Sequence, residues 1–187
     1  LQAKFHSRPT KSQLNGAARS IVGSSTWALM RIGRFTGDIA FLVMHDRPTY
    51  DILCNVFRRD GTAGSSTITA NQALSDSLRY PVVSAWLNNH HQFQFIKPTG
   101  IVIHETHDHI AFTPHGFLQD RQTKNAPRML VKVECRKIGG RRATRRNDMT
   151  LAEIQHGLIV TGCQECVILQ CDMSTYKTDW IREVPHT

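Results

Sequence analysis

The sequence predicts an all-β protein, a single eight-stranded antiparallel jelly roll in which two sheets pack face to face. Short runs of alternating or continuous apolar residues recur along the chain, and no long amphipathic helix is visible between them. The eight runs lie at residues 26–35, 39–45, 79–87, 93–103, 109–113, 128–137, 153–161 and 166–173. Many short strands joined by polar loops are typical of double-sheet β folds and argue against an α/β enzyme.

The runs differ in how their apolar residues are arranged. Residues 129–136 alternate most clearly between apolar and polar side chains, as expected for a strand with one buried face. Residues 39–44 are apolar on both faces, which indicates a strand covered on each side. The long connection 46–77 has apolar residues at helical spacing within 50–57, which predicts a short helix in this inter-strand loop.

This strand register places one set of apolar side chains between the two sheets. The predicted core residues are Trp27, Leu29, Phe41, Val43, Val131, Val133, Val167 and Leu169. A length of 187 residues suits one such domain. We expect a basic, extended arm at 1–25, a jelly roll at 26–175 and a C-terminal tail at 176–187.

The chain carries 23 Lys and Arg against 15 Asp and Glu, a formal net charge of +8 that favours a polyanionic partner such as nucleic acid. The alternative is an ordinary basic protein. Flexible cations in the arm and around the Gly-Gly bend at 139–140 predict phosphate contacts, although a solvated loop or a nuclear-import signal would look the same. The candidate nucleic-acid-binding residues are Lys4, Arg8, Lys11, Arg19, Arg136, Lys137, Arg141, Arg142, Arg145 and Arg146.

The segment 104–109 contains three histidines and is the most catalytic-looking feature of the chain. His107 and His109 would share one face of a strand, where two imidazoles can bind a metal. This pattern resembles the metal site of cupin enzymes and leaves such an enzyme as an alternative. The carboxylate that the cupin pattern expects shortly after the pair is missing, because the next acid is Asp120. A polar loop is therefore the preferred interpretation, with no metal.

The remaining motifs give no further chemistry. Cys163 and Cys166 have the spacing of half a zinc site, but no second pair follows, which favours structural, reduced thiols. No phosphate-binding loop, dinucleotide fingerprint or nucleophile elbow occurs. No segment approaches the roughly 20 apolar residues that span a bilayer. The sequence thus predicts a non-enzymatic protein without catalytic residues, cofactors or a membrane partner.

Several segments, taken in order, resemble the coat proteins of geminiviruses. Residues 21–35 (IVGSSTWALMRIGRF) are similar to the stretch that opens the jelly roll of that family, and 41–48 (FLVMHDRP) to its buried strand. Val56-Phe57 stands where the family has a short helix, and 74–86 (LSDSLRYPVVSAW) is similar to a later strand. The family's Cys- and His-containing basic arm is absent. A related circular single-stranded DNA virus, such as a genomovirus, is nearly as suitable a source.

The resemblance implies a capsid protein that assembles as many copies into a small T=1 icosahedral shell around circular single-stranded DNA. It further implies a virion protein that enters the host nucleus through import factors and meets a vector. A monomeric nucleic-acid-binding β-domain is a third possibility. We expect the arm, rather than the loop at 137–146, to make most contacts with DNA.

Overall fold

The computed structural model of the chain describes residues 30–31, 33–37, 40, 70–97, 100–123, 126–136, 148–172 and 178–183. Several sequence predictions lie outside these residues: the strand at 39–45 except Ala40, which is helical, the helix at 50–57, the basic arm, and core residues Trp27, Leu29, Phe41 and Val43. No helix among the described residues has the length and apolarity needed to cross a membrane.

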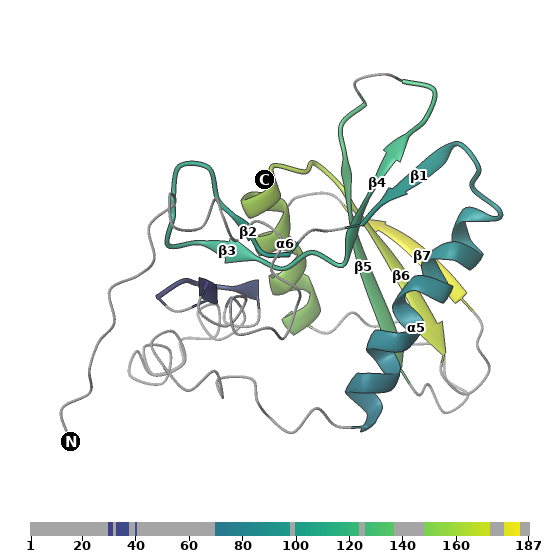
Figure 1. The fold of residues 1–187 in the computed structure, drawn as a ribbon, viewed down its shortest axis with the longest axis horizontal. Helices are drawn as coiled ribbons and strands as arrows, with labels where there is room; N and C mark the ends of the chain where they lie inside the picture. Colours follow the sequence, from purple (N-terminus) through teal and green to yellow (C-terminus); the bar gives the residue numbers. More distant parts are fainter. Residues whose placement is uncertain are drawn as a thin grey trace.

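The described chain forms a five-stranded mixed sheet and a separate two-stranded ribbon, with two helices (Figure 1). The elements in order are α5 (Ala70–Leu87), β1 (Phe93–Ile96), β2 (Val102–Ile103), β3 (Ala111–Phe112), β4 (Gly116–Asp120), β5 (Met129–Arg136), α6 (Asp148–Thr161), β6 (Cys166–Asp172) and β7 (Thr178–Glu183). The large sheet has the order β1-β4-β5-β6-β7. Its pairs are antiparallel except β5 and β6, which run parallel. The protein is therefore rich in strands, but the described part has neither the strand order nor the purely antiparallel pairing of a jelly roll.

Helix α5 replaces the strand predicted at 79–87. The β-branched pair Val82-Val83 and the preceding Pro81 favour an extended chain locally. Val82, Val83 and Trp86 nevertheless lie at helical spacing, and all three are buried against the large sheet. Packing on the sheet therefore overrides the local preference, and this helix covers one face of β5 and β6 (Figure 1).

Helix α6 replaces the strand predicted at 153–161. Its buried residues Ile154 and Leu158 are four positions apart, which puts them on one helical face. The helix connects β5 to β6, and two parallel neighbouring strands need a crossover of this kind. α6 contacts β5 and both strands of the β2–β3 ribbon.

The remaining strand predictions are partly confirmed. β5 and β6 lie within the predicted runs at 128–137 and 166–173. The run at 93–103 divides into β1 and β2, and only Ala111–Phe112 of the run at 109–113 is a strand. In place of an extended strand at 26–35, the described residues give a bridge from Phe35 to Ile110. β4 was not predicted, and β7 lies within the range expected to be a tail.

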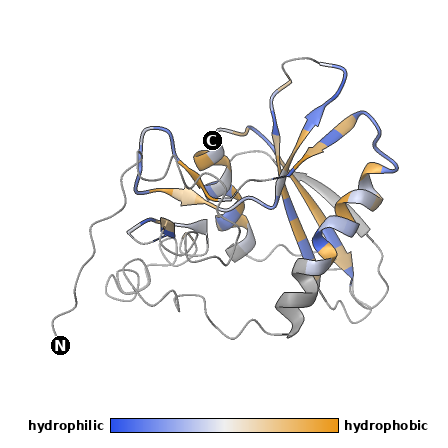
Figure 2. Cartoon of the chain, in the orientation of Figure 1, coloured by the Kyte–Doolittle hydropathy of each residue, from blue (hydrophilic) through white to orange (hydrophobic). Residues whose placement is uncertain are grey.

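Two apolar clusters hold the sheet between its helices. One joins α5 to the face of the strands that includes Val131, Val133, Val167 and Leu169, so this part of the predicted core is confirmed. The other joins α6 to the opposite face. Along β5, polar and apolar residues alternate, and Figure 2 shows this alternation in colour. The polar residues of β5 consequently lie under α6, where the candidate site is found.

Candidate functional site

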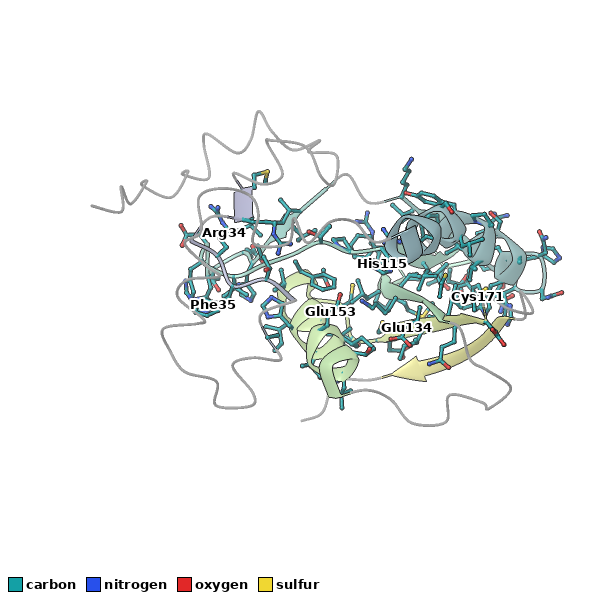
Figure 3. All side chains as sticks on the ribbon, turned by 90° about the horizontal axis from the view of Figure 1, so that it is seen from below. Arg34, Phe35, His115, Glu134, Glu153 and Cys171 are labelled. Atoms are coloured by element: carbon teal, nitrogen blue, oxygen red, sulfur yellow. The ribbon has the colours of Figure 1, made fainter. Side chains whose placement is uncertain are left out.

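Six polar side chains from four segments lie on and around the middle of the large sheet, most of them on the side that α6 covers. We call this set the polar cluster; its members are His115, Lys132, Glu134, Thr150, Glu153 and Gln170. His115 immediately precedes β4. Lys132 and Glu134 belong to β5, Thr150 and Glu153 to α6, and Gln170 to β6. Figure 3 labels three of them, which lie near the middle of the domain between the two helices.

Glu134 is a nearly buried carboxylate at the centre of the polar cluster's hydrogen bonds. Its residue is only 8% exposed. The Thr150 hydroxyl donates a hydrogen bond of 2.7 Å to Glu134 Oε1, and the Gln170 amide donates one of 3.1 Å to Oε2. The second bond follows from register, because Glu134 and Gln170 are partners in the parallel β5–β6 pair. Both carboxylate oxygens are thus engaged, as a nearly buried charge requires.

Lys132 is two residues earlier on the same face of β5. Its Nζ lies 2.6 Å from Glu153 Oε2 of α6, and the two side chains are 13% and 26% exposed. This ion pair joins the sheet to the helix at the partly accessible end of the cluster. A lysine ammonium keeps further N–H donors when one carboxylate oxygen is bound, so Lys132 can also bind a second anion.

His115 lies beside Lys132 at the start of β4. The antiparallel register pairs Gly116 with Val131, so His115, the residue before Gly116, lies opposite Lys132. The backbone N–H of Val133 donates a hydrogen bond of 3.0 Å to His115 Nδ1. Burial lowers the pKa of His115 well below 6.5, and the positive charges of Lys132 and Arg79 lower it further. The imidazole is therefore neutral at neutral pH.

The three histidines singled out in the sequence lie elsewhere, in the turn between β2 and β3. His104 Nδ1 accepts hydrogen bonds from the backbone N–H groups of Thr106 and His107, so this side chain holds the turn. The rings of His107 and His109 are 5.7 Å apart, and both residues are exposed. Within the described ranges, no group of three His, Cys, Asp or Glu side chains is placed to hold a metal ion. The cupin alternative is accordingly unsupported.

The structure places only one of the predicted nucleic-acid-binding residues, Arg136, at the end of β5. Lys4, Arg8, Lys11, Arg19, Lys137, Arg141, Arg142, Arg145 and Arg146 lie outside the described residues, so their contacts with DNA stay a prediction. The polar cluster itself was missed. The signal was present, because Lys132 and Glu134 alternate with buried valines, but a polar strand face is expected to meet solvent when no covering helix is predicted.

The cysteine pair at the α6–β6 connection has the properties of buried structural thiols. Cys163 and Cys166 are both buried and free. Burial raises the pKa of Cys166 to about 12 and also raises the pKa of Cys163. Buried thiols with raised pKa values are poor nucleophiles at neutral pH. The preference for structural thiols is therefore supported at this position.

The fold is similar to that of an alkaline exonuclease. The crystal structure of LHK-Exo in complex with dAMP matches 87% of this chain and 83% of its own, with a TM-score of 0.69 and 17% identity. The structure of the alkaline exonuclease LHK-Exo from Laribacter hongkongensis matches over the same shares with a TM-score of 0.67. The structure of SSO0001 matches with a TM-score of 0.53 and 8% identity over 95% of this chain and 75% of its own. No family model and no curated protein matches the sequence.

These likenesses correct the identification drawn from sequence. The chain has the fold of an exonuclease structure over most of its length, whereas the geminivirus-type resemblance implied a capsid jelly roll. The resemblance to coat proteins was therefore wrong, and so were the capsid function and the non-enzymatic role built on it. Its motifs were short segments with few identities, and one of them, 74–86, belongs to helix α5.

Proposed function

We propose that the protein is a nuclease that acts on DNA. The observation that carries this proposal is the match to the dAMP complex of LHK-Exo, which covers most of both chains. The reaction is hydrolysis of a phosphodiester: water adds to phosphorus, the bond to the 3′ oxygen breaks, and that oxygen takes up a proton. The net charge of +8 supports a DNA substrate, because a basic protein is attracted to the phosphate backbone.

The polar cluster is the best-supported location for the scissile phosphate. It combines a lysine, a neutral histidine and carboxylates in one partly enclosed site on the central strand β5. Enclosure strengthens each electrostatic contact with the phosphate, and groups held by the sheet need no rearrangement when DNA binds. The exposed histidines at the β2–β3 turn lack this enclosure.

Nucleases commonly use divalent metal ions held by carboxylates. The described residues do not fit such a centre. Both oxygens of Glu134 accept protein hydrogen bonds, and Glu153 is paired with Lys132. Within the described ranges, no group of three His, Cys, Asp or Glu side chains, His115 included, is arranged to hold a metal ion. What these residues offer the reaction is the binding and orientation of phosphate.

A cleavage assay tests the proposed function. Purified protein is incubated with end-labelled linear duplex DNA and, separately, with covalently closed circular DNA, in Mg²⁺ and in EDTA. An exonuclease releases mononucleotides from the linear substrate and leaves the circle intact. The Lys132→Gln variant, prepared in parallel, reports contaminating nucleases, because a contaminant would cleave equally in both preparations. Folded wild-type protein that releases no nucleotide under either condition contradicts the proposal.

A further inference from the structure

The neighbours of His115 fix its protonation state. The Val133 N–H that meets His115 Nδ1 can only donate a hydrogen bond, so Nδ1 must present its lone pair. Because burial and two nearby cations keep this imidazole neutral, its proton is on Nε2. His115 therefore presents a fixed N–H donor on the side of the ring away from β5. A donor held in this way suits an oxygen of a ligand and cannot coordinate a metal through Nε2.

The charges around His115 favour an anion over a cation. Lys132 and Arg79 both act on the ring through their positive charges. The two carboxylates of the polar cluster are already committed, Glu153 to Lys132 and Glu134 to Thr150 and Gln170. A divalent cation would have to displace these partners while lying close to two positive side chains. Phosphate oxygens, by contrast, accept hydrogen bonds from both an ammonium and a neutral imidazole.

We propose that the polar cluster binds a backbone phosphate of DNA directly, through His115 Nε2–H and the Lys132 ammonium, with no divalent cation between them. Glu153 acts as a positioning residue that holds the ammonium beside His115. Glu134, fixed by Thr150 and Gln170, sets the orientation of β5 and is not a metal ligand. This inference rests on the proposed function only in taking DNA as the ligand.

Binding of a fluorescein-labelled single-stranded oligonucleotide, followed by anisotropy, tests this inference. Wild-type affinity in EDTA is expected to equal that in millimolar Mg²⁺. Lys132→Gln and His115→Gln are each expected to weaken binding about tenfold, the loss of one hydrogen bond to a charged group. Lys97→Gln is the matched control. Lys97 carries the same charge but is exposed, with its Nζ 4.9 Å above the Tyr80 ring. Its replacement is expected to change affinity by less than about twofold.

Two further arms keep the outcomes distinct. Lys132→Gln alone leaves Glu153 without its cation, so Lys132→Gln/Glu153→Gln is measured as well, with circular dichroism to confirm folding. Mn²⁺ binding, followed by electron paramagnetic resonance, is expected to be the same in wild type and in Glu134→Gln. A Mn²⁺ site lost in Glu134→Gln, or DNA binding abolished by EDTA, overturns the inference while leaving a nuclease possible. Binding in EDTA, together with no cleavage in either Mg²⁺ or EDTA, supports the inference and contradicts the nuclease.

Discussion

Replacing Thr150 by Val removes one hydroxyl from the polar cluster and little else. The two side chains have nearly the same shape, so the substitution leaves the packing of α6 intact. It deletes the 2.7 Å hydrogen bond to Glu134 Oε1 at a residue that is only 5% exposed. Because Glu134 is itself 8% exposed, water cannot readily replace the hydroxyl.

The magnitude follows from the charge of the acceptor. A hydrogen bond to a charged group contributes about 1.5–3 kcal/mol to stability, roughly twice the contribution of a neutral pair. In a protein of this size, each kcal/mol shifts the melting temperature by about 2–4 °C. We therefore expect Thr150→Val to lower the free energy of unfolding by about 1.5–3 kcal/mol and the melting temperature by about 3–12 °C.

Urea unfolding followed by tryptophan fluorescence measures this change, and Trp86 is a buried probe on the α5 face. A double-mutant cycle with Glu134→Gln isolates the contribution of the pair, since the Thr150 substitution should cost much less when the partner is uncharged. If Thr150→Val lowers the free energy of unfolding by less than about 0.5 kcal/mol while Glu134 is present, the change is no larger than that of an average surface substitution. That result would refute the view that Glu134 is held by Thr150.

Three further predictions concern other parts of the structure. Because the pKa of His115 is below its unfolded value of 6.5, the unfolded chain binds more protons just below that pH, and stability falls as pH drops from 6.5. Urea titrations at several pH values in this range should show that the free energy of unfolding falls less steeply with decreasing pH in His115→Gln than in wild type. Gly157→Ala places a Cβ 2.8 Å from the Phe112 ring, so it should lower the free energy of unfolding by about 1–3 kcal/mol, as measured by thermal melting. An increase in stability, as the helix propensity of Ala alone would give, would contradict this contact. Cys166, with its pKa raised to about 12, should be alkylated by iodoacetamide only after unfolding, as read by mass spectrometry.

Local patterning predicted the parts of the fold in which local and tertiary preferences agree. β5 and β6 alternate or run apolar over seven or eight residues and were found with nearly correct bounds. The segments at 79–87 and 153–161 are also apolar and β-branched, yet both are helical. In each, helical spacing of buried residues was present but was outweighed by local strand preference. The parallel pairing that requires α6 as a crossover is not local, so no short window of sequence shows it.

The candidate site was harder to predict than the fold. Its members come from four segments between 115 and 170, and no two adjacent residues form a recognisable motif. In the sequence, Lys132 and Glu134 have the pattern of an ordinary solvent-facing pair, and only the position of α6 shows that they are covered. His115 gains its neutral state only from burial and from cations brought close by folding. The clustered histidines at 104–109 attracted attention instead, although they hold a turn.

An NMR titration with a short single-stranded oligonucleotide in EDTA tests the central claim most directly. The Val133 amide donates to His115, so it reports on any ligand that contacts that ring. We predict that the amide resonances of Val133, Lys132 and Gly116 shift together as oligonucleotide is added, and that these shifts are reduced in Lys132→Gln. Shifts confined to the hollow lined by Asp120, Arg128 and Glu165, with Val133 unchanged, would contradict phosphate binding at the polar cluster.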